Sequence, residues 1–248
     1  MSKSCLITGG SGGVALALAT QLRAEGWRVV RAGRSLERLA PDHGDTLIEA
    51  DVSTETGAAF AMNEATARLG SVPTAVVNAA GGIVLAGIAR TTEAQYRACL
   101  SANLDTAFFV SKAYVTALQA AKQGGSLLLF SSVAARIGVG NHVAIAMAKG
   151  GIEALVRSLA ADHSVLGLRV NAIAPGLMET PLTARMVNNE TGQKAIAAQY
   201  PLGRYGQAED AAALAAFLLG EHAGWISGQI IAVDGGFTAV RPLVRPSA

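Results

Sequence analysis

The fold is decided by the stretch Cys5-Leu6-Ile7-Thr8-Gly9-Gly10-Ser11-Gly12-Gly13-Val14-Ala15-Leu16-Ala17. In this stretch a short apolar run leads into a glycine-rich turn, and the turn leads into an alanine-rich segment of helical character. Glycine lets the backbone turn sharply and approach a bulky anion, and the free N–H groups of the following helix attract phosphate. Strand, glycine turn and helix in this order predict the dinucleotide-binding unit that opens a doubly wound fold.

Composition and length indicate one soluble α/β domain spanning residues 1–248. Of the 248 residues, 51% are hydrophobic, and the net charge of +2 gives no sign of a nucleic-acid surface. Cys5 and Cys99 lie in a strand-like and a helix-like run, which predicts core residues in a reducing compartment and neither a disulfide nor a metal site. Residues 1–4 show no signal peptide, and the most apolar stretch, 75–89, is too short and too interrupted to span a bilayer. We therefore expect a cytoplasmic protein that does not bind membranes.

Short apolar runs alternate with longer helical patterns along the chain, which predicts a parallel sheet with helices on both faces. The expected strands are 5–8, 28–32, 46–50, 75–78, 126–131, 169–173 and 229–233. The expected helices are 14–25, 56–69, 93–121, 143–162 and 208–219. Thr92 and Gln95 have the spacing of a capping box at the start of the long helix.

Residues 176–206 are polar, irregular and without strong periodicity. They follow the carboxyl end of a strand, where ligands bind in open α/β sheets, so they are either a substrate lid or a plain surface excursion. The apolar residues of this segment indicate an apolar substrate, unless they serve only to anchor the segment itself. These residues are Leu177, Met178, Leu182, Met186 and Val187.

Further motifs follow the glycine loop in a fixed order. They are Asp51-Val52, Asn78-Ala79-Ala80-Gly81, Asn103, Ser131-Ser132, Pro175-Gly176 with Thr180, and Asp234-Gly235-Gly236. Together with residues 8–15 they resemble the motifs of the short-chain dehydrogenase/reductase family, and the resemblance covers nearly the whole chain. Ala15 replaces the last glycine of the family's loop, which is a mild departure because that position serves helix–strand packing.

The resemblance implies a single doubly wound Rossmann-type α/β domain with a parallel sheet of about seven strands and helices on both faces. It also implies a nicotinamide cofactor, a small-molecule substrate, and a homodimer or homotetramer joined through the helices 93–121 and 143–162. The residues that it assigns to cofactor binding are Gly9, Ser11, Gly12, Gly13, Val14, Asp51, Val52, Asn78, Ala79, Ala80, Gly81, Lys149, Pro175, Gly176 and Thr180. Those that it assigns to catalysis are Ser132, Lys149 and Asn103.

The family's Tyr-x-x-x-Lys motif is broken in this chain. It reads Ile145-Ala146-Met147-Ala148-Lys149, so the lysine is in place and isoleucine stands where the tyrosine belongs. In the family, the tyrosine protonates the carbonyl oxygen, the lysine lowers the tyrosine pKa and holds the nicotinamide ribose, the serine orients the carbonyl, and the asparagine supports a water relay. Isoleucine donates no proton, and general acid catalysis contributes about 10²–10⁴-fold, or roughly 3–5 kcal/mol of barrier.

Three hypotheses follow from the missing hydroxyl. In the first, which we favour because Ser132, Lys149 and Asn103 remain, the protein is an oxidoreductase whose proton comes from Lys149, a water or a substrate group. In the second, it is a nucleotide-binding sensor or partner subunit, in which Lys149 remains for the ribose alone. In the third, the scaffold runs an elimination, or a reduction that needs no carbonyl protonation. His142, one turn before Ile145, could donate a proton, although the sequence favours a surface or capping role for it.

The end of the second strand decides between the two nicotinamide cofactors. An NAD enzyme places Asp or Glu there to accept from the ribose 2′-OH, whereas this chain has Gly33 followed by Arg34. A guanidinium binds a 2′-phosphate through charge-assisted hydrogen bonds, so the sequence predicts NADP(H). The alternative is that Arg34 is only a solvated loop charge.

Overall fold

A computed structural model describes residues 3–39, 44–187 and 189–241. Seven parallel strands form the main sheet in the order β3-β2-β1-β4-β5-β6-β9. Their bounds are β1 Ser4–Thr8, β2 Arg28–Gly33, β3 Thr46–Glu49, β4 Ala75–Asn78, β5 Gly125–Phe130, β6 Leu168–Pro175 and β9 Ile230–Val233. The expected doubly wound sheet is confirmed, and the strand order reverses between β1 and β4, where such sheets bind ligands.

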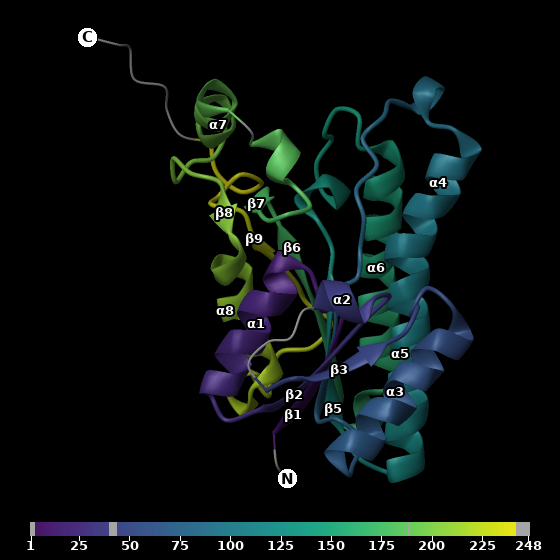
Figure 1. Ribbon diagram of the computed structural model, residues 1–248. Helices are drawn as coiled ribbons and strands as arrows, with labels where there is room; N and C mark the ends of the chain where they lie inside the picture. Colours follow the sequence, from purple (N-terminus) through teal and green to yellow (C-terminus); the bar gives the residue numbers. More distant parts are fainter. Residues whose placement is uncertain (1–2, 40–43, 188, 242–248) are drawn as a thin grey trace.

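Helices cover both faces of the sheet (Figure 1). One face carries α1 (Gly13–Ala24) and α8 (Ala208–Leu219). The other carries α3 (Glu55–Leu69), α5 (Thr106–Ala121) and α6 (Val143–Asp162). Because both faces are covered, the central strands are buried along nearly their whole length and consist of continuous apolar runs. The two cysteines are free and buried in these cores.

Local sequence signals fix the ends of several helices. The Thr92 hydroxyl accepts a hydrogen bond from the Gln95 N–H, and the Gln95 side chain accepts one from the Thr92 N–H, so the capping box of α4 (Glu93–Leu100) is present. The expected helix 93–121 is not uniform, because π-helical turns over Ser101–Asp105 separate α4 from α5. None of the described helices is long and apolar enough to cross a membrane.

The segment 176–206 contains more regular structure than the sequence indicates. It holds the short strand β7 (Met178–Glu179), a 3₁₀ turn at Ala184–Met186 and α7 (Glu190–Ala197). The Asn189 side chain caps α7 by accepting from the N–H of Gly192. The expectation of an irregular segment is therefore wrong for α7, whose eight residues are too few for a clear periodic signal. The short helix α2 (Leu36–Leu39) was likewise not expected.

Candidate active site

The glycine loop is packed closely against its neighbours, most tightly at Gly9. Gly9 has φ +68°, and a Cβ placed there would lie 2.4 Å from the backbone nitrogen of Ala80. A Cβ on Gly13 would lie 3.1 Å from Thr180, which brings the loop after β6 against the start of α1. Gly12 precedes α1 without any side-chain cap, so the helix presents its first N–H groups unsatisfied by a cap. These features fit a cofactor diphosphate, which binds N–H groups at such a helix start.

Arg34 and Asp51 lie at the neighbouring ends of β2 and β3. The Ala50 N–H donates to the Gly33 carbonyl at 2.8 Å, which joins these two ends, and both Arg34 and Asp51 are exposed. The pKa of Asp51 is lowered, first by hydrogen bonds from the Ser53 hydroxyl and N–H and further by the Arg34 guanidinium. Val52 is 5% exposed, so it faces mainly the core.

The Asn78 side chain connects the residue before the glycine loop to the start of α5. Its side-chain oxygen accepts from the Thr8 hydroxyl at 2.6 Å, and its amide nitrogen donates to Thr106 at 3.2 Å. The Asn78 side chain is 2% exposed and bonded at both ends, so it holds the neighbouring backbone in place. Ala79, Ala80 and Gly81 then follow into the wall of the main cavity.

Sequence reasoning missed Arg31, a fully buried arginine inside β2. Its Nε bonds Asp45 at 2.6 Å, and its Nη1 donates to the carbonyls of Gly10 at 2.8 Å and Leu39 at 2.9 Å. Arg23 of α1 pairs with the same carboxylate. Arg31 thus ties the glycine loop to the segment that carries Arg34. The signal that could have revealed it is a charged residue inside an apolar strand run, since buried arginines are rare unless paired.

Lys149 lies buried at the floor of the main cavity. Its Nζ donates to the Phe130 carbonyl at 2.8 Å, and its side chain is 9% exposed. Burial lowers the pKa of Lys149 to about 8, because the charged form loses its hydration. The lysine therefore sits close to a change of charge near neutral pH.

Asn103 lies in the π-helical turns between α4 and α5, and it is 1% exposed. Its amide nitrogen donates to the carbonyls of Cys99 at 2.9 Å and Gly82 at 3.0 Å. A Cβ on Gly81 would lie 3.0 Å from the Asn103 oxygen and 3.8 Å from Lys149 Nζ, so the Asn78–Gly81 loop, Asn103 and Lys149 meet at one point. π-helical turns are frequent at functional sites.

The two serines that end β5 have different partners. Ser131 is buried and donates to the Glu153 carboxylate at 2.9 Å, so its hydroxyl is held by α6. Ser132 is partly exposed, and its hydroxyl accepts from the Ala134 N–H at 3.2 Å, which leaves its own proton free for a ligand. Both residues line the main cavity.

Ile145 occupies the position of the missing hydroxyl and is 5% exposed. It packs with Cys99 and Ala144 and against the partly buried Val84 and Tyr96, and its remaining surface lines the main cavity. Ile145 therefore adds an apolar surface to the cavity that Ser132 and Lys149 also line, and its side chain has no proton to donate.

His142 also lines the main cavity, one turn before Ile145. Its ring Nδ1 lies 2.6 Å from the Gly140 carbonyl oxygen. Although His142 stands at the N-cap position of α6, its side chain makes no capping hydrogen bond. Of the surface or capping role that the sequence favours, the capping part is therefore wrong, while the ring remains partly exposed and also lines the cavity.

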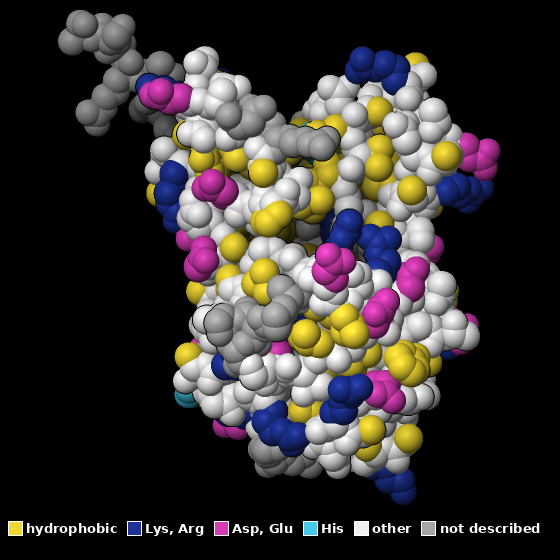
Figure 2. Space-filling model, viewed as in Figure 1, with side chains coloured by type: hydrophobic (Ala, Val, Ile, Leu, Met, Phe, Trp, Pro, Cys, Tyr) yellow, Lys and Arg dark blue, Asp and Glu magenta, His cyan; other side chains and the backbone are white. Residues whose placement is uncertain are grey.

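The main cavity has a volume of about 370 Å³ and lies between the catalytic residues and the segment 176–206. Figure 2 shows a hollow with hydrophobic walls between the part of the molecule that carries α7 and the part that carries α4. The segment 176–206 supplies one wall, with Leu177, Met178, Leu182, Met186 and Ile196. Among the described lining residues, Lys149 is the only charged side chain.

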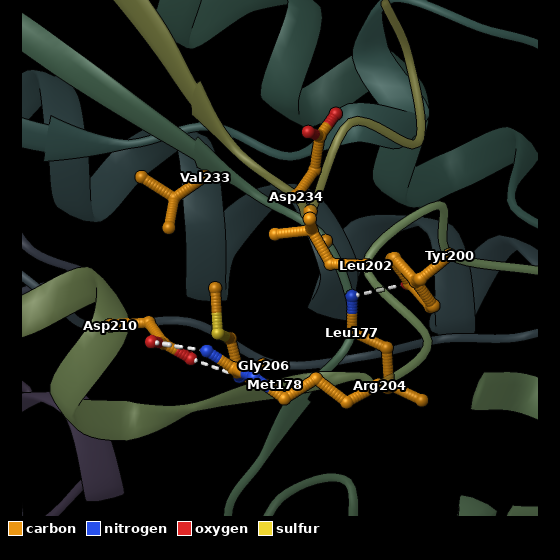
Figure 3. A pocket seen from close by; sticks show the side chains of 11 residues that line it. Leu177, Met178, Tyr200, Leu202, Arg204, Gly206, Asp210, Val233 and Asp234 are labelled. Carbon is orange, nitrogen blue, oxygen red and sulfur yellow. Dashed lines mark hydrogen bonds and ion pairs between the residues drawn. The ribbon is translucent and has the colours of Figure 1, made fainter. Parts of the chain in front are cut away.

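Tyr200 separates the main cavity from a smaller pocket of about 180 Å³. Its hydroxyl accepts from the Leu177 N–H at 2.7 Å, and burial is the main cause that raises the pKa of this phenol. Figure 3 shows the smaller pocket, where the Arg204 and Asp210 side chains pair while Asp234 turns away from them. The Asp234 carboxylate instead accepts from the N–H groups of Gly236 and Thr238 and so orders the last turn.

Comparison with known proteins agrees with this geometry. A family model described as enoyl-(acyl carrier protein) reductase matches residues 9–238. The chain is 33% identical to 2-(S)-hydroxypropyl-CoM dehydrogenase 3 of Xanthobacter autotrophicus, over 94% of this chain and 96% of that protein. It is 34% identical to inactive 2-(S)-hydroxypropyl-CoM dehydrogenase 2 of the same organism, over 85% and 93%. The solved structure of levodione reductase superposes with a TM-score of 0.88 at 29% identity, over 96% of this chain and 98% of that one.

A Rossmann-type domain with this site defines a nicotinamide-dependent class of protein. The chain belongs to the short-chain dehydrogenase/reductase family. The residue four positions before Lys149 in this chain is Ile145.

Proposed function

We propose that this protein is an NADP(H)-dependent oxidoreductase that interconverts a small apolar carbonyl compound and its alcohol. The observation that carries the proposal is the convergence of Ser132, Asn103 and Lys149 on one cavity that continues to the uncapped start of α1. A site that only bound nucleotide would not require a free Ser132 hydroxyl facing an apolar chamber. The family's dehydrogenase and reductase relatives support the reaction class.

Each residue has a separate task in this reaction. A bound nicotinamide supplies or accepts the hydride. The Ser132 hydroxyl donates a hydrogen bond to the substrate oxygen, because it accepts from the Ala134 N–H and its own proton is left for a ligand. Lys149 is expected to bind the ribose while the Phe130 carbonyl holds its ammonium group in place. Asn103 fixes the Gly81–Gly82 turn against the lysine and supports a water beside it.

The preference for NADP(H) rests on the end of β2. Gly33 provides no carboxylate to accept from a ribose 2′-OH, and Arg34 is exposed beside Asp51 where a 2′-phosphate would lie. The residues Gly9, Ser11, Gly12, Gly13 and Val14 would hold the diphosphate, and Pro175, Gly176 and Thr180 would cover the nicotinamide. Arg31 supports this site from beneath by bonding the glycine loop.

The lid and the assembly are part of the same proposal. Segment 176–206 closes an apolar wall over the cavity, which favours an uncharged, apolar substrate. Phe108 on α5 and Met147 on α6 are 51% and 54% exposed, which supports a homodimer or homotetramer joined through these helices. We expect the protein to work in the cytoplasm.

One observation favours a second candidate, a nucleotide-binding sensor or partner subunit without chemistry. Ile145 is packed into the wall instead of leaving a space that a water could fill, and one relative of similar identity bears the name inactive. The cofactor site would be unchanged in such a protein. An elimination on the same scaffold remains the third candidate and has no separate support.

The test combines binding with turnover. Fluorescence titration of the purified protein with NADPH and NADH should give tighter binding of NADPH. Oxidation of NADPH should then follow the addition of uncharged ketones such as cyclohexanone, acetophenone or 2-octanone. Tight NADPH binding with no oxidation by any ketone would favour the sensor, and failure to bind either nucleotide would remove both candidates.

A further inference from the structure

We propose that His142 is the proton donor that replaces the missing tyrosine, acting through its Nε2 on the substrate oxygen. This inference rests on the proposed oxidoreductase function. It assigns a catalytic task to a residue outside the family's motif positions, and it explains how Ser132 and Lys149 can remain useful beside an isoleucine.

A proton donor must lie near the substrate oxygen, and the position of His142 meets this requirement. His142, Ile145 and Lys149 are spaced three and four residues apart, so they share one face of α6. His142 lies about 4.5 Å along the helix axis from Ile145, at 1.5 Å per residue. All three line the cavity that holds the Ser132 hydroxyl. A substrate oxygen displaced by one helical turn from the family's position would therefore meet the imidazole.

The ring is held in a defined orientation. Asn141 has φ +61°, a left-handed conformation that few residues other than glycine adopt, and its side chain accepts from Arg90 at 3.2 Å. This turn brings the His142 ring over the Gly140 carbonyl, which accepts from Nδ1 at 2.6 Å. In the described parts of the chain, Nε2 has no hydrogen-bond partner, so the second ring nitrogen is left for a ligand.

The other candidates in the cavity are weaker acids for this task. Lys149 already donates to Phe130 and lies at the cavity floor, where it is needed for the ribose. Tyr200 lies on the opposite wall, and burial raises the pKa of its phenol, so it holds its proton more firmly than a free tyrosine. The Ser132 hydroxyl orients the oxygen, and an unactivated serine is too weak an acid to release its proton.

The proposed step is balanced. The substrate carbon accepts a hydride, with its electron pair, from the reduced nicotinamide, and the carbonyl π pair moves to oxygen. The oxygen takes the proton of the imidazolium Nε2, which leaves a neutral imidazole and an alcohol. Solvent at the cavity mouth returns a proton to the imidazole. In the alcohol-to-ketone direction the neutral imidazole accepts the proton.

The charged groups around the ring determine how the rate depends on pH. Lys149 and Tyr200 share the cavity from α6 and from the lid, and Arg90 is bonded to the adjacent Asn141. A fall in the reduction rate near pH 8 is expected from Lys149, because burial lowers the pKa of its ammonium group to about 8.

The first experiment compares His142→Gln with the matched variant His222→Gln. Glutamine keeps a hydrogen-bond donor but has no proton to transfer, and His222 is exposed on the turn Glu221–Ala223 away from the cavity. We expect His142→Gln to lower kcat for ketone reduction by about 10²-fold or more, with NADPH affinity unchanged. The fall near pH 8 that belongs to Lys149 should remain in this variant. His222→Gln should match the unmodified protein.

The second measurement needs no turnover and uses the unmodified protein. Imidazole ¹⁵N signals are followed in the complex with NADP⁺ while cyclohexanone is added, and Nε2 of His142 should shift while His222 does not. Unchanged kcat in His142→Gln, or an unmoved His142 signal, would overturn the proposal while leaving the proposed function intact. Loss of reduction in Tyr200→Phe alone would assign the proton to Tyr200. Absence of any turnover in NADPH-bound unmodified protein would overturn both.

Discussion

The two halves of this molecule follow the family pattern to different degrees. In the half built on β1, β2 and α1, the glycine loop, the uncapped helix start and Arg34 are all present, and buried Arg31 braces them. In the half built on β5, β6 and α6, Ser132 and Lys149 remain but Ile145 fills the position of the acid. Changes at the β2 end should therefore affect the diphosphate and 2′-phosphate contacts, whereas changes at Ile145 should affect mainly the chemistry.

The largest effect, on the free energy of unfolding, is expected from replacing Arg31 in the half that carries the glycine loop. Arg31→Met leaves the buried Asp45 with Arg23 as its one ion-pair partner among the described residues, and removes a donor from the Gly10 and Leu39 carbonyls. We expect the free energy of unfolding to fall by about 3–5 kcal/mol, as for other broken buried ion pairs. Urea denaturation measures this. Arg68→Met, which removes an exposed pair with Glu64, is the control and should change it by less than about 0.5 kcal/mol.

A smaller effect, limited to the relative affinity for NADPH and NADH, is expected at Arg34. Arg34→Ala removes the cation expected to bind the 2′-phosphate and should weaken NADPH binding by about 1.5–3 kcal/mol, with NADH unchanged. Isothermal titration with both nucleotides checks this, and Arg38→Ala on the same exposed turn is the control. Equal affinity of the unmodified protein for NADPH and NADH would show that Arg34 is only a solvated charge.

The buried charge of Lys149 is expected to lower the free energy of unfolding of the protein. Its pKa is lowered from 10.5 to about 8, so between these values the unfolded chain binds more protons and stability rises with pH. At pH 7 the buried charge lowers the free energy of unfolding by about 3 kcal/mol, at about 1.4 kcal/mol for each unit of pKa shift. The hydrogen bond to the Phe130 carbonyl offsets about 1 kcal/mol of this loss. Lys149→Met should therefore stabilise the protein by about 2 kcal/mol at pH 7.

That gain should be fully present below pH 8 and should shrink as the pH rises toward 10.5. Thermal unfolding across this range measures it, with the exposed Lys112→Met as control. A Lys149→Met protein that is less stable than the starting protein at pH 7 would contradict the buried charge. The variant should also lose ketone reduction.

The smallest expected effect restores the missing hydroxyl. Ile145→Tyr places a phenol one turn from Lys149 and should raise ketone reduction tenfold or more, unless overpacking against Cys99 and Tyr96 costs about 1–3 kcal/mol and closes the cavity. Circular dichroism and NADPH titration must first show a folded, cofactor-binding variant. The gain should disappear when Lys149→Ala is added. A folded, loaded variant with no gain would favour the sensor or the third candidate.

Local signals in the sequence predict most of the fold. The sheet strands are apolar runs bounded by turn residues, and the bounds of α6 and α8 agree with the expected 143–162 and 208–219. The π-helical turns around Asn103 were not predictable, because they depend on bonds to Gly82 and Cys99. Arg31 gains its meaning only when the Leu39 and Gly10 carbonyls converge on it.

The candidate site also combines features that the sequence reveals with features that depend on contacts between distant segments. The replacement at Ile145 is visible in the sequence, but its packing against Val84 and Cys99 requires segments far apart in the chain. Only the capping part of the expectation for His142 is wrong, because the left-handed turn at Asn141 directs the ring toward Gly140. α7 was missed because its short length gives little periodic signal.

The central claim is that the catalytic half still transfers hydride without its tyrosine. A single turnover of the protein with NADPH deuterated at the transferring position and excess cyclohexanone tests it most directly, because it detects even a slow reaction. The account predicts cyclohexanol carrying one deuterium on the carbinol carbon. Bound NADPH that stays reduced, with no deuterated alcohol from this or any other uncharged ketone, would contradict it.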